Sequence, residues 1–170
     1  MLTLRTWPVL WVTAVLAVGF HAPRVVAAED GSGDIVYLNS ATRALRGGDA
    51  REALDILEHT TAAPEAGESM ARHHGIACRA WLEEDRPEKA RPHCEQAIAN
   101  ASARSRWRYF NNLGVAAFRL GDDAAAREAF NNAAILAGVV VTPRKNLELL
   151  GQGEVAAENR EAVGASLVIR

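Results

Sequence analysis

The sequence predicts an all-α fold, built as an α-solenoid of about three helical hairpins with a C-terminal capping helix. Three segments share one pattern: an apolar helical half, a short polar break, and a second half that contains alanine. The three copies are residues 41–61, 78–98 and 114–134. Their matching alanines, Ala53, Ala90 and Ala126, are 37 and 36 residues apart. A fixed period in the thirties is typical of stacked helical hairpins, which bury their apolar faces only against neighbouring units.

Residues 1–28 differ in composition from the rest of the chain. Arg5 precedes an uncharged apolar run of 14 residues (7–20), and Val26 and Ala28 are small residues of the kind found before a signal-peptidase cleavage site. We therefore expect a signal peptide cleaved after Ala28, and the Ala-rich, low-Cys composition favours a bacterial periplasm as the destination. The alternative is a retained membrane anchor, but the run is shorter than the roughly 20 residues that span a bilayer.

The repeat domain is predicted to span residues 34–151, after a short flexible N-terminus at 29–33. Asp34 lies at an N-cap position, and the apolar residues that follow it are spaced by three and four. The sequence Gly-Gly-Asp at 47–49 ends this helix, because glycine tolerates the left-handed conformation found at helix C-termini. Residues 50–60 form the partner helix of the first hairpin.

The second hairpin is predicted to begin near Ser69. Pro87 suits the first turn of its second helix, whereas Pro92 removes a backbone donor five residues later. A kink or a late helix start is expected there. Cys78 and Cys94 lie on the two helices of this hairpin, both on the packed face.

The third hairpin has the clearest pattern, with helices at 106–121 and from Asp122 or Asp123 to 138, either acid serving as the N-cap. Residues 143–151 match the first half of a fourth unit, since Asn146 corresponds to Asn112. Such a terminal half-unit would cover the last apolar face. The tail at 152–170 could add another short helix, and its apolar end has no predicted place.

These units resemble the tetratricopeptide repeat (TPR) family, in an exported bacterial form. The matching positions are Ala41, Ala44, Gly48, Ala53, Leu57 and Thr60 in the first unit, Ala77, Cys78, Trp81, Ala90, Cys94 and Ala97 in the second, and Leu113, Gly114, Gly121, Ala126, Phe130 and Ala133 in the third. Ala117 occupies the family's aromatic position, and Cys78 and Asp85 replace its glycines in the second unit.

The resemblance implies that a partner binds the inner, concave wall made by the first helix of each pair. Carried over to this chain, the partner-binding residues are Arg72, Arg79, Arg108, Asn111, Phe118, Arg119 and Lys145. The arginines fit a carboxylate, and Asn111 could bond a peptide backbone. We therefore expect a non-catalytic protein–protein interaction adaptor that takes a peptide segment, acidic or carboxylate-bearing. The plainer interpretation is that these side chains are solvated faces of surface helices.

The sequence contains no motif that favours catalysis, such as a glycine-rich phosphate loop, a His-Glu metal helix or a serine elbow, so no enzyme activity and no cofactor is expected. Without residues 1–28, which contain Arg5 and Arg24 and no acid, the formal net charge changes from −2 to −4, which is too mild to indicate a nucleic acid or an anionic membrane as the partner of the mature chain. Two alternative functions stay open: a small periplasmic redox or metal-handling protein, and an assembly subunit that associates with itself through its first helix or terminal half-unit.

The two cysteines are consistent with either of two states. An even cysteine count in an exported protein favours a Cys78–Cys94 disulfide, while the alternative is two buried free thiols. Together with His74 and His93 they have a zinc-like composition, but adjacent residues 93 and 94 point about 100° apart on a helix. We therefore expect no metal site.

Overall fold

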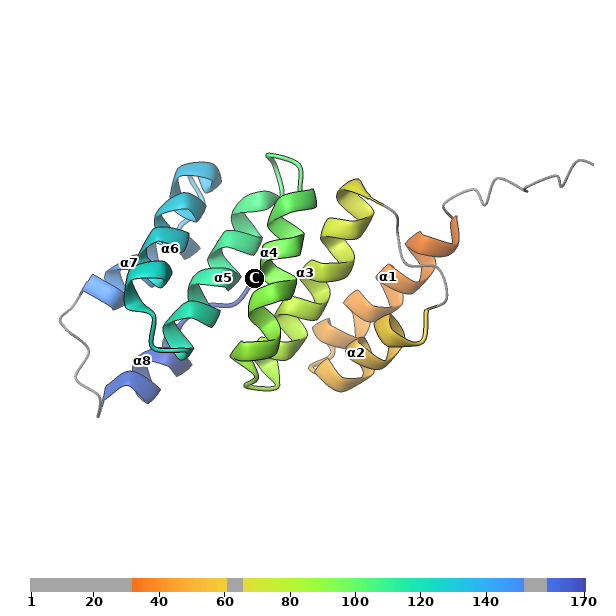
Figure 1. Ribbon diagram of the computed structural model, residues 1–170, viewed down its shortest axis with the longest axis horizontal. Helices are drawn as coiled ribbons and strands as arrows, with labels where there is room; N and C mark the ends of the chain where they lie inside the picture. Colours follow the sequence, from red (N-terminus) through yellow and green to blue (C-terminus); the bar gives the residue numbers. More distant parts are fainter. Residues whose placement is uncertain (1–31, 61–65, 152–158) are drawn as a thin grey trace, which may run out of the picture.

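The computed structural model describes residues 32–60, 66–151 and 159–170, and every regular element in them is a helix (Figure 1). The helices are α1 (Ser32–Arg46), α2 (Ala50–Glu58), α3 (Gly67–Glu83), α4 (Pro87–Asn100), α5 (Arg106–Arg119), α6 (Asp123–Ala137), α7 (Thr142–Gly151) and α8 (Arg160–Ser166). The all-helical prediction is therefore confirmed for the described part of the chain. None of its helices combines the length and apolarity needed to cross a bilayer. The expected signal peptide (1–28) lies outside the described residues.

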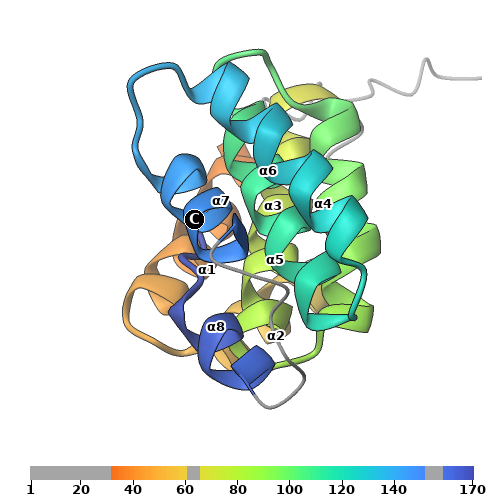
Figure 2. The same cartoon turned by 90° about the vertical axis from the view of Figure 1, so that its left-hand side faces the viewer.

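The helices pack mainly with their neighbours in sequence. Short turns join α1 to α2, α3 to α4 and α5 to α6, and the two helices of each pair pack together. Successive pairs also touch, through α1 with α3, α3 with α5, and α4 with α5, so that the pairs form a row that ends at α7 (Figure 1). Seen from the α7 end, α4 and α6 lie on one side, while α7, α8 and the C-terminal residues lie on the other (Figure 2).

The three hairpin turns share a backbone conformation. Gly48, Asp85 and Gly121 all have positive φ, at 84°, 53° and 84°. Glycine adopts this region without steric cost, whereas the Cβ of an aspartate disfavours it. After the two glycine turns, Asp49 accepts a hydrogen bond from the Glu52 N–H at 2.8 Å, and Asp122 accepts one from the Ala125 N–H at 3.1 Å. These contacts cap α2 and α6, as the sequence suggested for Asp122.

The helix starts differ from the predicted ones at three places. α1 begins at Ser32, so Asp34 lies inside its first turn and not at the N-cap. α3 begins at Gly67, two residues before Ser69. α4 begins at Pro87 and continues through Pro92, so there is no late start; the missing N–H removes only one hydrogen bond from a helix packed along its length.

The small residues at the matching repeat positions belong to the hydrophobic core. Ala53, Ala90 and Ala126 are fully buried, as the sequence predicted, and Phe130 fills the adjacent space in the third pair. Gly114 allows α5 to approach this ring, because a Cβ there would lie 2.6 Å from Phe130 carbon atoms. A larger side chain would force the two helices apart.

Candidate peptide-binding groove

Residues Leu167–Arg170 run along the surface of α5 and α7 in a non-helical conformation. α8 ends at Ser166, and Leu167 adopts an extended backbone (φ −68°, ψ 132°). The chain then continues to Arg170 on the side of the molecule that carries α7 and α8 (Figure 2). We call Leu167–Arg170 the tail segment. The domain division at residue 151 predicted from sequence therefore leaves out a segment that packs against the repeats.

Three asparagines hold the backbone of the tail segment. Asn146 accepts the Val168 N–H at 3.0 Å and donates to the Val168 carbonyl at 3.1 Å. Asn111 donates to the same carbonyl at 2.8 Å and accepts from the Asn146 amide at 3.0 Å. Asn112 accepts the Arg170 N–H at 2.7 Å and donates to the Arg170 backbone oxygen. We call Asn111, Asn112 and Asn146 the amide clamp.

The amide clamp is completely removed from solvent. All three side chains are 0% exposed, and each amide oxygen and nitrogen has a partner. A buried amide without a partner would cost about 1–3 kcal/mol. The tail segment supplies most of these partners, through the N–H and carbonyl groups of Val168 and Arg170.

The tail segment and α8 also cover apolar residues of α5. Leu167 is buried in the same core cluster as Val115 and Phe118, and Ile169 packs against it. The Arg160 guanidinium lies 4.9 Å from the Phe118 ring centroid and donates to the Phe118 carbonyl at 3.1 Å. Two of the predicted partner-binding residues, Asn111 and Phe118, thus lie together beneath the C-terminal residues of the chain itself.

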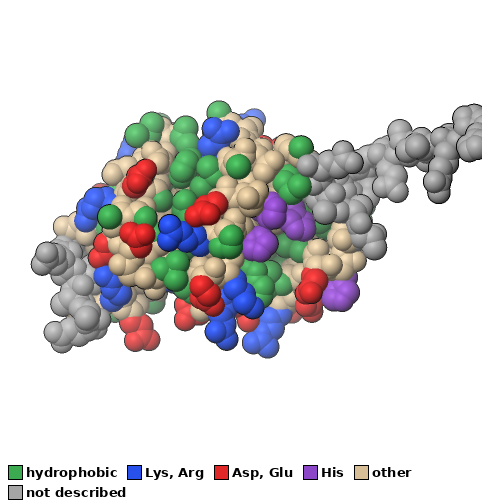
Figure 3. Space-filling view, viewed as in Figure 1, with side chains coloured by type: hydrophobic (Ala, Val, Ile, Leu, Met, Phe, Trp, Pro, Cys, Tyr) green, Lys and Arg blue, Asp and Glu red, His purple; other side chains and the backbone are tan. Residues whose placement is uncertain are grey.

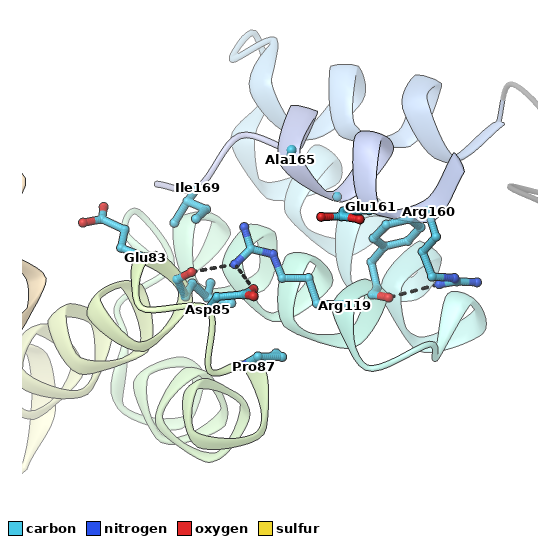
Figure 4. A pocket seen from close by; sticks show the side chains of 11 residues that line it. Glu83, Asp85, Pro87, Arg119, Arg160, Glu161, Ala165 and Ile169 are labelled. Atoms are coloured by element: carbon cyan, nitrogen blue, oxygen red, sulfur yellow. Dashed lines mark hydrogen bonds and ion pairs between the residues drawn. The ribbon is translucent and has the colours of Figure 1, made fainter. Parts of the chain in front are cut away.

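Three of the predicted cationic residues contact other parts of the protein. Arg79 pairs with Glu83 one turn away on α3 at 2.7 Å, and the Arg108 guanidinium lies over the Trp107 ring. Arg119 donates to the Leu82 carbonyl at 2.5 Å and is 3.4 Å from the Asp85 carboxylate, which fastens α5 to the α3–α4 turn (Figure 4). Lys145 is exposed on α7, next to the clamp residue Asn146.

The Arg119 contact lies at the edge of a pocket of about 560 Å³ between the α3–α4 turn, α5 and α8. Glu83, Asp85 and Ile169 of the tail segment line it on one side, and Arg160 and Glu161 line it on the other (Figure 4). The tail segment thus lines this pocket through Ile169, and it also occupies the space between α5 and α7 where the amide clamp holds it.

Arg72 belongs to a second cluster of cations, which the sequence analysis missed. A pocket of about 340 Å³ is lined by Arg72 of α3 and by Arg43 and Arg46 of α1, together with Asn39 and Thr42. Arg72 donates to Asn39 at 3.0 Å, and within the described residues none of the three guanidinium groups forms an ion pair. The spacing of 39, 43 and 46 on one helix face is the signal that could have indicated this arginine pocket.

Cys78 and Cys94 form a disulfide that joins α3 to α4, with an S–S distance of 2.06 Å and a Cα–Cα distance of 5.1 Å. Of the two states considered from the sequence, the structure contains the disulfide. Both residues are 0% exposed, so neither sulfur faces solvent.

Histidine side chains gather on one face over α3 and α4 (Figure 3). The Nδ1 atoms of His74 and His93 lie 2.9 Å apart, and the rings of His73 and His74 meet edge to face. Burial, and to a smaller extent the neighbouring rings of His93 and His73, lower the pKa of His74 to about 4. The described residues contain no cluster of three or more side chains suited to hold a metal ion.

Asn112, Asn146 and the tail segment were not among the site residues predicted from the sequence. The signal was present in the correspondence of Asn146 with Asn112 across the repeat, which places two amides on neighbouring first helices. Comparisons of this chain with protein-family models, with curated proteins and with solved structures found no match.

Proposed function

We propose that this chain is a non-catalytic adaptor that binds a peptide segment of a partner protein in the groove between α5 and α7. The observation that carries this proposal is the amide clamp, whose three buried asparagines hold an extended backbone. Main-chain hydrogen bonds of this kind provide affinity for an extended peptide, and pockets for alternate side chains provide specificity. The repeated hairpins fit a TPR-like α-solenoid, whose first helices would line the groove.

We further propose that the partner is acidic where it passes α1 and α3. Arg43, Arg46 and Arg72 line one pocket, and among the described residues none of them forms an ion pair, although Arg72 also interacts at longer range with Glu68. Guanidinium groups bind carboxylates in a two-pronged geometry. The sequence suggested a carboxylate contact near Arg79, Arg108, Arg119 and Lys145. The pocket lined by Arg43, Arg46 and Arg72 supports such a contact better.

The proposed setting is the bacterial periplasm or envelope. The N-terminal composition favours a cleaved signal peptide, and a disulfide is compatible with an oxidising compartment. An assembly complex of the envelope would be a suitable context for a small adaptor with no catalytic motif.

Site-specific photo-crosslinking in envelope extracts tests this function. A photoreactive side chain placed at Lys145, beside the clamp, and another at Arg46, in the arginine pocket, should crosslink to one and the same partner protein. The matched control is Arg127, which is exposed on α6. Equal adducts from Arg127, or no adduct from the two groove positions, would contradict the proposal.

Self-association is a second candidate, favoured by the turn between α6 and α7. Val139 and Val141 are exposed in this turn, Val139 to 91%, and Ile135 is exposed just before it, near the end of α6. Clustered exposed aliphatic side chains often mark a protein–protein contact. Sedimentation at increasing concentration should then show a dimer or larger species that the double variant Ile135→Glu/Val139→Glu abolishes.

A further inference from the structure

We infer that the tail segment is a built-in competitor of the partner, and that the partner segment repeats its chemistry: aliphatic residues two positions apart, followed by a basic residue. The inference rests on the proposed function, because it concerns occupancy of the same groove. It follows from the contacts that Leu167–Arg170 makes with α5 and α7.

The backbone contacts make occupancy exclusive. In an extended chain, residues two apart present their N–H and C=O groups along the same edge. Val168 and Arg170 are such a pair, and each exchanges both groups with the clamp. Because the tail segment occupies the clamp and the three amides are fully buried beneath it, a second extended chain can bind the clamp only after the tail segment leaves.

The side chains of the tail segment define the ligand class. Leu167 and Ile169 alternate with the clamped residues and pack against the core cluster at Phe118. The Arg170 guanidinium donates to the Thr142 hydroxyl at the start of α7, from Nε at 3.2 Å and from Nη2 at 3.0 Å. A partner that replaces these contacts needs two aliphatic anchors and a terminal cation or other strong donor.

Attachment to the chain gives the tail segment an advantage over any free peptide. A tethered ligand acts at an effective concentration in the millimolar range. The apparent affinity for an external segment falls in proportion to the fraction of molecules whose groove is empty. The partner therefore binds by displacement, and a change that weakens the tail segment should strengthen partner binding.

The test compares three forms of the full chain: wild type, Val168→Pro and Val168→Ala. Proline removes the N–H that donates to Asn146, and the extended conformation of Leu167 is compatible with a following proline. Alanine shortens the same side chain but keeps the donor, so it is the matched control. The probe is a fluorescein-labelled peptide, Ala-Ser-Leu-Val-Ile-Arg, with the sequence of residues 165–170. Fluorescence anisotropy measures its binding.

We expect Val168→Pro to bind the probe at least tenfold more tightly than wild type or Val168→Ala, a change of about 1.4 kcal/mol. Adding Asn112→Ala and Asn146→Ala to Val168→Pro should abolish this binding. If Val168→Pro loses helix content by circular dichroism, Leu167→Asp/Ile169→Asp provides the same comparison, because it removes the anchors and keeps the backbone donors.

Equal binding of the probe by all three forms would overturn the inference and leave the adaptor function standing. A different outcome would be that Val168→Pro is folded, that its NMR spectra show the tail segment detached from the clamp, and that it still does not bind the probe. This would overturn the inference and the proposed peptide groove together. A third outcome is that wild type and Val168→Ala are each dimeric and Val168→Pro is monomeric. This would mean that a second copy of the chain fills the groove, and it would overturn the assignment to an external partner.

Discussion

The side-chain amide of Asn146 binds both backbone groups of Val168, 22 residues further along the chain. Its oxygen accepts the N–H at 3.0 Å and its nitrogen donates to the carbonyl at 3.1 Å. A neighbouring strand would supply such a pair of contacts in a β-sheet. Here one residue of α7 supplies it, so the position of α7 against α5 determines whether an extended chain can be held.

Replacing Asn146 should therefore loosen the tail segment. In Asn146→Ala, the Val168 N–H and an acceptor on Asn111 lose their partner, and we expect the free energy of unfolding to fall by about 1–3 kcal/mol. Urea denaturation measures this change, and hydrogen exchange at the Val168 amide should become faster. Asn131→Ala, an exposed asparagine of α6, is the control and should change stability by less than about 0.5 kcal/mol. Identical exchange at Val168 in the two variants would contradict the role of Asn146.

Reduction of the Cys78–Cys94 disulfide should destabilise the α3–α4 pair. The bridge closes a loop with a sequence separation of 16, for which the chain-entropy model gives about 3 kcal/mol. In reductant we expect the free energy of unfolding to fall by about this amount and the urea midpoint to fall with it. The variant Cys78→Ala/Cys94→Ala should be insensitive to reductant. A midpoint that reductant leaves unchanged, with reduction verified by mass, would show that the bridge does not stabilise the fold.

The repeat period was sufficient to predict the all-helical fold and the close-packed alanines. Ala53, Ala90 and Ala126 recur at a nearly constant spacing, and each is completely buried in the hydrophobic core. Helix ends were harder to predict, as at Asp34, because N-terminal turns depend on local contacts that a propensity argument does not contain.

The occupant of the groove could not be predicted from the repeats. The sequence indicated Asn111 as a backbone-binding residue and Phe118 as part of the wall, and the structure brings both beneath the C-terminal residues. Which chain fills the groove depends on long-range contacts such as Asn112 with Arg170, 58 residues apart, and periodicity carries no information about those. The arginines were similarly ambiguous, since Arg119 and Arg72 have the same chemistry but different neighbours.

Replacing Asp85 by glycine should stabilise the fold. Asp85 holds the same turn position as Gly48 and Gly121 but with φ at 53°, where a Cβ is unfavourable. We expect Asp85→Gly to raise the free energy of unfolding by about 0.5–1 kcal/mol. Loss of the ion pair with Arg119 should reduce this gain only slightly, because the Asp85 side chain is 86% exposed. Chemical denaturation measures the change, with Asp85→Ala as the control that loses the carboxylate but keeps the Cβ. A gain in Asp85→Ala equal to that in Asp85→Gly would assign the effect to the carboxylate and not to the backbone.

Gly114 should not tolerate even a methyl group. The added Cβ of Gly114→Ala would lie 2.6 Å from the Phe130 ring, which is itself fully buried, so the ring or the helices would have to shift. We expect a loss of about 1–3 kcal/mol in thermal or urea unfolding. Gly151→Ala is the matched control, because it lies at the end of α7 with no atom within 4 Å of the new Cβ, and it should be neutral or slightly stabilising. Equal effects at the two positions would contradict close packing of α5 on α6.

Acid should destabilise the fold through the histidines of α3 and α4. The pKa of His74 falls to about 4 in the folded state, mainly because of burial, and burial also lowers the pKa of His73 and of His93. The unfolded chain therefore binds more protons than the folded one between about pH 6.5 and 4, and stability falls as the pH decreases through that window.

The expected loss for His74 is on the order of 1 kcal/mol, because partial exposure of the ring to water screens the effect. The free energy of unfolding, measured by urea denaturation at pH 7, 6, 5 and 4, gives the slope. His74→Gln should flatten it, whereas His59→Gln, an exposed histidine beyond α2, should leave it unchanged. A slope in His74→Gln as steep as in wild type would assign the acid sensitivity to other groups.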